Sequence, residues 1–502
     1  MLLSELLYDG EYLRASTPEV FGYDIPCVSS DSRNIKSGAA FVCLRGMHTD
    51  GMLYISEAAA RGASVCICES PPVLCQTEFV IVKNARLCLS YMLCRFYSNA
   101  AEKMKIFAVT GTNGKTSTCS FLREIFLSAG KKTAYIGTLK SYIGRDRFYL
   151  GKEDEERMST MTTPDPEQFY RMLEEMKKQG VEYLIMEASS HALRLDKLAP
   201  LHFAASAFTN FSAEHLDFHC DLSNYLLSKC KIFSMSDKVY VNADDSVCRS
   251  SVGVFSAPTV TFGVKNESCD YVAKDIESHG IDGISYTLRS KDAAFRISSH
   301  IPGAFTVYNT LAAACMSYEE GISPSVIGEA IKNVSCVEGR LEKIKLGQQC
   351  GDISVFIDYA HTEKAMENLL LSVIQFKGAG QRIVTLFGCG GDRDKAKRAP
   401  MGRVASLYSD FVIITEDNSR SEDPEKIIYD IMKGIDQTKP HIIIKNRKKA
   451  IEYAIKTALP GDIILLVGKG HEQYEITKEG KVPFSEKDIV FECLQEKNGG
   501  NK

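Results

Sequence analysis

The chain has 502 residues, too many for a single hydrophobic core, which predicts about three domains of ordinary size. Its apolar fraction of 44% and charged fraction of 25% are those of a soluble globular protein. A formal net charge of −4 gives no overall basic field, so nucleic acid is not expected as the main partner.

The N-terminal stretch "MLLSELLYDGEYL" lacks the basic start and the unbroken apolar core of a signal peptide. The longest apolar runs have the length of a strand and are too short to cross a bilayer. We therefore expect a cytoplasmic protein without membrane insertion. The 17 cysteines are scattered and form no C-x-x-C pair, so we expect reduced, buried thiols and no zinc ribbon or redox motif.

The first part of the chain, residues 1–101, predicts a small α/β domain with strands at 39–46 and 63–70 and a helix at 52–62. Residues 102–338 predict a larger second domain that opens with a strand at 105–110, a glycine-rich turn and a helix at 115–130. In that domain we expect buried strands at 182–189, 203–210, 238–244 and 259–264, and an antiparallel patch at 283–301.

Residues 339–502 predict a third domain, with buried strands at 354–361, 382–391, 411–418, 441–446 and 462–472. Polar and glycine-rich loops follow these strands at their carboxyl ends, where open α/β sheets bind ligands. Short strands that alternate with helices favour mainly parallel sheets. The predicted fold class is therefore α/β in three domains, with a phosphate-loop domain in the centre and a Rossmann-like domain at the C-terminus.

The stretch "KIFAVTGTNGKTSTCSFL", residues 105–122, carries the strongest functional signal. A strand, a glycine-rich turn and a helix start present backbone N–H groups and the helix N-terminus to phosphates. Lys115 is expected to reach the terminal phosphates, and the Thr116 hydroxyl to bind Mg²⁺. Val109 stands where the usual G-x-x-x-x-G-K-[ST] pattern has its first glycine. A plain strand-to-helix turn would not need Gly, Lys and Thr in this order, so we interpret the stretch as an ATP-binding loop.

Three further side chains in the second domain are weaker candidates when taken singly. Glu187 ends a buried strand, where its carboxylate would suit Mg²⁺, although a lone acid at a strand end is more often structural. His215 and His219 are four residues apart, as in a helical zinc pair, but no H-E-x-x-H and no third ligand accompany them, which argues against zinc. Lys229 alone has the pattern of a solvated helix lysine.

Loops of the third domain place charged side chains at strand ends. They offer Arg393 in "GCGGDRDKAKR", Arg420 in "TEDNSRSEDP", and Lys469, His471 and Glu472 in "GKGHEQY". Arginine forks pair with carboxylates through two parallel hydrogen bonds. Any one of them is equally well explained as a solvated loop, but the set predicts a pocket for a zwitterionic substrate. An ATP loop with such a pocket indicates ATP-driven joining of an acid to an amine through an acyl phosphate.

At these residues the chain resembles the Mur ligases of bacterial cell-wall synthesis, and most closely the subgroup that adds the third residue of the stem peptide. "TGTNGKTS" is the family's form of the ATP loop, which accounts for the missing glycine. The resemblance runs nearly the whole chain in order, through "SDSRNIKSGAAFV", "GMHTDG", "TTPDP", "MEASSHAL", "FTNFSAEHLDFH", "DYAHT", "GCGGDRDKAKR" and "GKGHE". Such an ordered series is specific, whereas each motif alone is weak.

The resemblance implies a UDP-sugar-binding domain at 1–101, a central ATP-binding domain at 102–338 and a C-terminal amino-acid-binding domain at 339–502. The UDP portion falls at Asp31, Ser32 and Arg33 and at the "GMHTDG" turn, and the muramoyl dipeptide at Thr162, Thr163, Ser189, Ser190 and Arg194. ATP falls at Gly111, Thr112, Asn113, Gly114, Lys115, Thr116, Ser117, Asn309, Arg340, Asp358 and His361. The Mg²⁺ ligands are Thr116, Glu187, His215 and Lys229, the last as a CO₂-derived carbamate that turns a cation into a carboxylate. The catalytic set is Lys115, Glu187, His215 and Lys229.

The amino-acid pocket falls at Arg393, Asp417, Asn418, Arg420, Gly468 and Glu472. Family members that add meso-diaminopimelate usually carry D-N-P-R where this chain has "DNSR", residues 417–420. Ser419 loosens the loop, because proline pre-sets φ, but the arginine is kept. Since a kept arginine suits a distal carboxylate, we favour meso-diaminopimelate over L-lysine as the acceptor. The other substrate is UDP-N-acetylmuramoyl-L-alanyl-D-glutamate, and a monomer is expected.

Other functions stay open at this point. Folylpolyglutamate synthase and cyanophycin synthetase share the loop, but the "DSR" region argues against the first and the chain length against the second. A relative recruited to another acidic substrate is compatible with Ser419. A nucleotide-hydrolysing switch is a different class, which should show D-x-x-G and N-K-x-D after the loop; neither is found in a suitable context. Turnover of ATP without any amino acid would identify such a switch.

Overall fold

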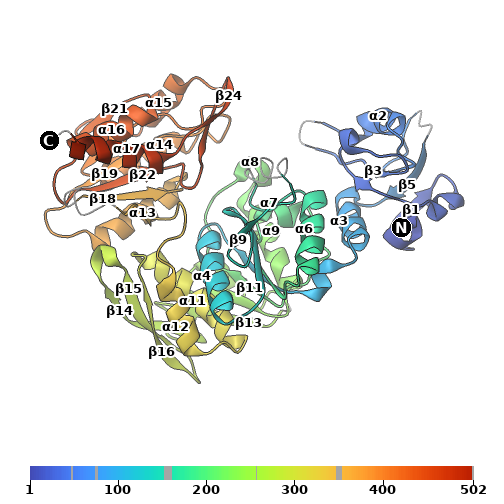
Figure 1. The fold of residues 1–502 in the computed structure, drawn as a ribbon, viewed down its shortest axis with the longest axis horizontal. Coiled ribbons are helices and arrows are strands. Elements are labelled where there is room, and N and C mark those ends of the chain that lie inside the picture. The colour runs from blue at the N-terminus through green and yellow to red at the C-terminus, as the bar shows by residue number, and fades with distance from the viewer. Residues whose placement is uncertain (47–48, 74–76, 152–160, 256, 346–352, 500–502) are drawn as a thin grey trace. The chain divides into compact units, whose positions relative to one another are not determined.

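The computed structural model describes residues 1–46, 49–73, 77–151, 161–255, 257–345 and 353–499 (Figure 1). These residues form two compact units. The first comprises residues 1–111, 126–209 and 220–261, and the second comprises 112–125, 210–219 and 262–502. The two units are described separately.

The N-terminal part of the first unit is a five-stranded sheet in the order β1-β5-β4-β3-β2. Its strands are β1 (Tyr12–Ala15), β2 (Val28–Ser29), β3 (Ala40–Val42), β4 (Val65–Cys68) and β5 (Glu78–Val82), and its helices are α1 (Leu3–Leu6), α2 (Ile55–Ala60) and α3 (Ala85–Phe96). All neighbours are parallel except β1 and β5. The predicted strands at 39–46 and 63–70 are confirmed as β3 and β4, and the predicted helix is confirmed as the shorter α2.

The rest of the first unit is built on seven strands in the order β12-β11-β6-β10-β7-β8-β9. They are β6 (Lys105–Thr110), β7 (Thr133–Gly137), β8 (Lys140–Ile143), β9 (Asp146–Phe148), β10 (Tyr183–Glu187), β11 (Ala205–Phe208) and β12 (Val239–Asn242), with α6 (Pro166–Lys178), α7 (Ser190–Arg194), α9 (Leu222–Ser234) and α10 (Ser246–Ser250). β6 lies between β10 and β11, parallel to both. In this order β10 and β7 lie on one side of β6, and β11 and β12 lie on the other. Open α/β sheets bind ligands in the crevice beyond the carboxyl end of a strand at which the order divides in this way, which here is β6.

In the second unit β14 (Tyr271–Ser278), β15 (Ile284–Arg289) and β16 (Ala294–Ser299) pair antiparallel, as the alternating polarity of residues 283–301 predicts. They follow β13 (Thr259–Gly263) and precede α11 (Ala304–Glu319) and α12 (Pro324–Asn333). The predicted patch is therefore confirmed.

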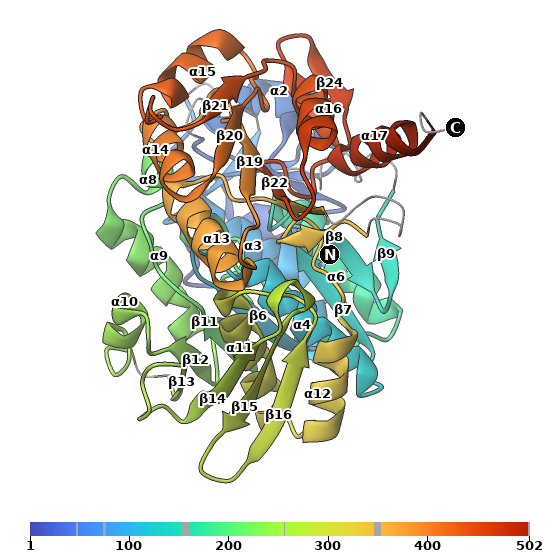
Figure 2. The ribbon, with the colours of Figure 1, turned by 90° about the vertical axis from the view of Figure 1, so that its left-hand side faces the viewer.

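A six-stranded sheet in the order β17-β18-β22-β19-β20-β21 carries the C-terminal part of the second unit. Its strands are β17 (Glu342–Lys343), β18 (Ser354–Asp358), β19 (Ile383–Phe387), β20 (Phe411–Ile414), β21 (His441–Ile443) and β22 (Ile463–Val467), and its helices are α13 (Glu363–Phe376), α14 (Arg398–Tyr408), α15 (Pro424–Met432), α16 (Arg447–Thr457) and α17 (Glu486–Gly499). Helices cover both faces (Figure 2): α13, α14 and α15 pack in one apolar cluster, α16 and α17 in another. The five predicted strands and the mainly parallel, doubly covered α/β arrangement are confirmed.

A buried ion pair fixes α16 and α17 at the carboxyl ends of this sheet. The side chains of Arg447 and Glu486 are 0% and 2% exposed, and their charged atoms lie 2.7 Å apart. Arg447 also donates to the carbonyl oxygen of Val467 at 3.0 Å. The arginine therefore links α17 to the end of β22.

Replacing Arg447 by methionine should lower the free energy of unfolding by about 3–5 kcal/mol, because Glu486 would be left buried without its partner. Chemical denaturation of the variant measures the loss. The matched control is Lys448→Met, since Lys448 and Glu492 form a pair in which both side chains are about half exposed, and little change is expected there. An equally small loss in both variants would contradict the role of the buried pair.

Two remaining expectations concern thiols and membranes. The cysteines of the described residues form no disulfide with one another, and most of them are buried thiols, as predicted. Among the described residues no helix combines the length and the apolar character needed to cross a bilayer.

Candidate active site

The predicted phosphate loop connects β6 to α4 (Lys115–Ser128). Gly114 has φ of +85°, in the left-handed region that glycine adopts without strain. Asn210 fixes the loop from the end of β11: its carbonyl oxygen and side-chain oxygen accept from the N–H groups of Thr112 at 2.9 Å and Asn113 at 2.8 Å. Lys115 folds back on the loop, with Nζ 2.8 Å from the Thr112 carbonyl oxygen. Hydrogen bonds within the protein therefore hold the loop, and Asn210 is a site residue that sequence analysis missed.

Glu187 ends β10 and lies fully buried beside the strand that feeds the loop, since it pairs with Val109 of β6. Its carboxylate accepts from the Tyr135 hydroxyl at 2.5 Å, and from the Thr138 N–H at 2.9 Å and hydroxyl at 3.0 Å. Three donors therefore hold the Glu187 carboxylate in one orientation. A carboxylate oxygen at this strand end has the chemistry that Mg²⁺ requires.

The predicted dipeptide residues gather around the same strand end in the first unit. Thr162 and Thr138 hydroxyl oxygens lie 3.1 Å apart, and those of Thr163 and Ser189 lie 3.4 Å apart. Ser189 caps α7, which carries Ser190 and, in its last turn, Arg194. The structure thus brings the four predicted hydroxyl residues together, with Arg194 one helical turn beyond.

Lys229 lies in α9 and is only 1% exposed, so the pattern of a solvated helix lysine is wrong here. Its Nζ donates to the carbonyl oxygen of Gly111, the first loop residue, at 2.7 Å and lies 4.6 Å from the centre of the Tyr225 ring. The buried amine is thus in direct contact with the first residue of the phosphate loop.

Within the second unit a further group lies around the loop and the start of α4. Arg340 donates to the Thr116 hydroxyl at 3.3 Å, and the Asn309 side-chain oxygen lies 3.4 Å from the Thr118 hydroxyl. Asp358 accepts from the N–H groups of Leu341 and Ala360, both at 2.7 Å. Burial raises the pKa of Asp358, and the charge of Arg340 opposes that shift. Arg340 therefore contacts Thr116 directly, Asn309 lies beside the first turn of α4, and Asp358 fixes the backbone that follows Arg340. Ser117 follows Thr116 in the same turn and is also buried.

Glu214 is a second residue that sequence analysis missed. It is largely buried and lies 3.4 Å from Nε2 of His361 and 3.8 Å from Nε2 of His215. Burial opposes its ionisation, but the hydrogen bond with His361 and the charges of His215 and Lys115 outweigh this and hold the pKa of Glu214 far below its usual range. An acid beside a candidate histidine in "AEHLDFH" was the available signal. Among the described residues no group of three His, Cys, Asp or Glu side chains is placed to hold a metal ion.

The predicted amino-acid pocket assembles at the carboxyl ends of β19, β20 and β22. The Asn418 side chain donates to Glu472 Oε2 at 2.7 Å, and Arg420 donates to the Gly391 carbonyl oxygen at 2.7 Å. Gly468 has φ of +116°, and a Cβ there would lie 2.7 Å from Oδ2 of Asp417. Arg393 is exposed on the neighbouring loop, and its Cγ and the Arg420 guanidinium both lie near Gly390. All six predicted residues therefore share one site, within which burial raises the pKa of Glu472 and neighbouring charges lower that of Asp417.

The predicted UDP residues lie at the end of β2. The Arg33 guanidinium is 2.7 Å from the Asp31 carboxylate and largely exposed, whereas the Ser32 hydroxyl donates to Glu57 at 3.1 Å. In the "GMHTDG" turn, Gly46 donates to the Thr49 carbonyl oxygen at 2.8 Å. Met47 and His48 of this turn lie outside the described residues.

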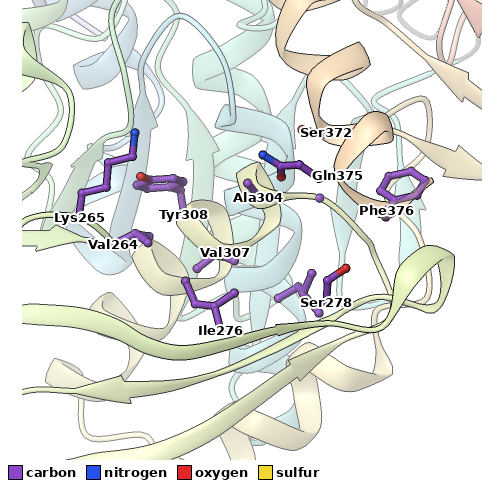
Figure 3. Close-up of a pocket in the computed structure, with 12 residues that line it drawn as sticks. Val264, Lys265, Ile276, Ser278, Ala304, Val307, Tyr308, Ser372, Gln375 and Phe376 are labelled. Atoms are coloured by element: carbon purple, nitrogen blue, oxygen red, sulfur yellow. The ribbon is translucent and has the colours of Figure 1, made fainter. Parts of the chain in front are cut away.

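A cavity of about 290 Å³ lies in the second unit, where the α11 start, the antiparallel strands and α13 meet (Figure 3). Ala304, Val307 and Tyr308 line it from α11. Asn309 is on a different face of that helix, because successive residues turn by about 100°. The cavity contains none of the predicted site residues and is not the nucleotide site that they define.

Comparisons with known proteins define the class. Residues 24–92 match the Mur ligase family, catalytic domain; residues 109–317 match the Mur ligase middle domain; and residues 339–470 match the Mur ligase, glutamate ligase domain. The chain belongs to the Mur ligase family, and the three-domain α/β fold class is confirmed.

Particular relatives match over nearly their whole length. A protein of Caldanaerobacter subterraneus subsp. tengcongensis named UDP-N-acetylmuramoyl-L-alanyl-D-glutamate--2,6-diaminopimelate ligase is 38% identical, with 99% of each chain covered. The protein of the same name from Clostridioides difficile (strain 630) is 38% identical, with 94% of this chain and 95% of the relative covered. A solved structure of a ligase with that name superposes with a TM-score of 0.68 at 25% identity, covering 99% of each chain.

Proposed function

We propose that the protein is an ATP-dependent ligase that joins meso-diaminopimelate to the D-glutamate of UDP-N-acetylmuramoyl-L-alanyl-D-glutamate, a step of peptidoglycan biosynthesis. The observation that carries the proposal is the end-to-end likeness to relatives with this name, together with an arginine, Arg420, kept in the acceptor loop. ATP is the energy source and Mg²⁺ the metal. The three domains are assigned to 1–101, 102–338 and 339–502, and the protein acts as a cytoplasmic monomer.

In this proposal the loop residues Gly111 to Ser117 bind the ATP phosphates through backbone N–H groups, and Lys115 reaches the terminal phosphate. Asn309, Arg340, Asp358 and His361 bind or orient the nucleotide. Thr116, Glu187 and His215 would hold Mg²⁺, a role that suits the Glu187 carboxylate, which three hydrogen bonds orient. Mg²⁺ supplies charge stabilisation on the transferred phosphoryl group.

Lys229 would be carried as a CO₂-derived carbamate and would add a ligand for a second Mg²⁺. Burial of its amine against the Gly111 carbonyl oxygen supports this, because a carbamate placed there would adjoin the phosphate loop. The carbamate supplies a negative oxygen ligand where the unmodified side chain is a cation.

The reaction then follows from positioning. Asp31, Ser32 and Arg33 hold the UDP portion, while Thr162, Thr163, Ser189, Ser190 and Arg194 hold the dipeptide. The γ-phosphoryl group passes to the D-glutamate carboxylate, giving an acyl phosphate and ADP. The acceptor, held by Arg393, Asp417, Asn418, Arg420, Gly468 and Glu472, attacks with its amine; the amide bond forms, and phosphate and a proton leave. Exclusion of water protects the acyl phosphate from hydrolysis.

Phosphate release from ATP tests the proposal directly. Purified protein with UDP-N-acetylmuramoyl-L-alanyl-D-glutamate would be supplied with meso-diaminopimelate, L-lysine, L-ornithine or no amino acid. We expect strong turnover with meso-diaminopimelate alone. A preference for L-lysine would keep the ligase and overturn the acceptor. Turnover without any amino acid would indicate a nucleotide-hydrolysing switch, and silence from a folded, ATP-binding protein would indicate another acidic substrate.

A further inference from the structure

A lysine outside the proposed substrate contacts lies at the centre of the acceptor site. Lys469 follows β22 in the turn Gly468-Lys469-Gly470, and both glycines have positive φ, +116° and +56°. A Cβ on Gly468 would lie 2.7 Å from Asp417 Oδ2, and a Cβ on Gly470 would lie 2.6 Å from that of Tyr359. The turn therefore packs closely against its neighbours at both glycines. The lysine side chain between them is therefore held in one direction.

In this orientation the ammonium group of Lys469 is buried. Lys469 is 0% exposed, and its Nζ donates to Asn418 Oδ1 at 3.0 Å and to the Tyr474 carbonyl oxygen at 3.1 Å. Oδ1 of Asp417 lies 3.7 Å away. Two of the three ammonium protons are donated to the Asn418 and Tyr474 oxygens, and the Asp417 carboxylate lies close enough to balance the positive charge. Since a buried ammonium is costly without such partners, they hold the Lys469 side chain in place, and its role is one of organisation.

Asn418 links the Lys469 ammonium to Glu472, one of the predicted acceptor residues. Its Oδ1 accepts from both Lys469 Nζ and the N–H of Ile476, the latter at 2.9 Å. Two donors on the oxygen fix which end of the amide is which, so the NH₂ end faces Glu472 and donates to Oε2 at 2.7 Å. The orientation of the Glu472 carboxylate is thus tied through Asn418 to the buried ammonium.

We propose that Lys469 is a positioning residue for the acceptor amino acid: its ammonium fixes Asn418, and Asn418 fixes Glu472 toward the amino groups of a diamino acid. The inference rests on the proposed function and deepens it. A diamino acid presents ammonium groups as well as carboxylates, so the site needs oriented carboxylates beside its arginines. Lys469 orients the Glu472 carboxylate through Asn418 without contacting the substrate.

The decisive variant is Lys469→Met, which keeps the length of the side chain and removes its charge. We expect the KM for meso-diaminopimelate to rise about tenfold or more, with the KM for ATP and for the UDP substrate unchanged. The control is Lys478→Met, which removes a charge from the exposed turn of the adjoining hairpin, β23 (Tyr474–Thr477) and β24 (Gly480–Pro483), and should behave as wild type. A parallel rise in all three KM values would overturn the positioning role.

A double-mutant cycle tests the route through Asn418. If Lys469 acts through that side chain, Lys469→Met should add little to the loss already caused by Asn418→Ala. Fully additive losses would show that Lys469 does not act through Asn418.

Should Lys469→Met fail to fold, Lys469→Gln keeps a hydrogen-bonding end without the charge and is judged by the same criteria. Failure of wild type with every amino acid would instead refute the proposed function, which separates the two outcomes.

A pH profile separates positioning from mere packing. The charged and titratable groups that face Glu472 are Asp417, Arg420, Lys469, Tyr359 and Tyr474. Burial already raises the pKa of Glu472, and the charge of Lys469 lowers it. Without the ammonium the carboxylate therefore takes up a proton at higher pH, and the protonated acid no longer attracts an ammonium. The KM ratio of variant to wild type should grow as the pH is lowered; a ratio independent of pH would count against the inference.

Discussion

Replacement of Lys229 by alanine is expected to lower kcat by about 1000-fold or more, the scale associated with loss of a group that stabilises transition-state charge. The structure gives the reason: the amine is 1% exposed and donates to the carbonyl oxygen of the first loop residue at 2.7 Å. Removal of the side chain would delete the proposed carbamate and leave a gap beside the phosphate loop. Initial rates of phosphate release at saturating substrates measure the effect.

The matched control is Lys231→Ala, since Lys231 lies two residues along the same helix, is partly exposed and pairs with Asp196 at 2.6 Å. It should retain nearly full turnover. Short-chain carboxylic acids added to Lys229→Ala should restore part of the activity, because they can occupy the gap and supply the lost oxygen ligand. A folded Lys229→Ala protein that binds ATP but gains nothing from any such acid would refute the carbamate role.

Much of this fold follows from local sequence patterns. The strands that support the site are short apolar runs bounded by glycine or polar residues, and β6, β10, β11, β18, β19, β20 and β22 all lie where those runs predict them. Local pattern also predicts that functional groups follow the strands, because carboxyl ends carry the loops. Glu187 and Arg420 were found in this way.

The remainder depends on contacts between distant segments. Asn210 fixes the phosphate loop from about a hundred residues away, and Glu214 gains its low pKa from His361, far along the chain. Lys229 illustrates the same limit: a lysine in a helix is ordinarily solvated, and its burial here comes with the contact that its amine makes to Gly111. No periodicity encodes such pairings, so the sequence signals them only through neighbouring motif residues.

Ser419 shows how tertiary structure replaces a local constraint. Proline would stiffen the acceptor loop by fixing φ. Here the next residue, Arg420, has φ of +52° and donates its backbone N–H to the Ile476 carbonyl oxygen at 3.0 Å, so the hairpin of β23 and β24 holds the loop from outside. The loop is therefore defined without proline, and the guanidinium keeps its place against Gly391.

Arg420→Ala is accordingly expected to reduce kcat/KM for meso-diaminopimelate by about 100-fold, because a paired guanidinium and carboxylate are lost. Turnover with L-lysine, which has no distal carboxylate, should fall much less, so the preference between the two acceptors should nearly disappear. Steady-state kinetics with each amino acid give the ratio directly. Arg403→Ala is the control, since that arginine is exposed in the same domain and pairs with Glu363.

Two outcomes separate acceptor recognition from loop damage. Alanine at a position with positive φ is itself strained, so Arg420→Asn, which tolerates that backbone, must show the same loss of preference. If both variants lose meso-diaminopimelate and ATP binding equally, Arg420 holds the loop and does not read the substrate. If the KM for ATP stays at the wild-type value while the preference collapses, the guanidinium is the group that distinguishes the two acceptors.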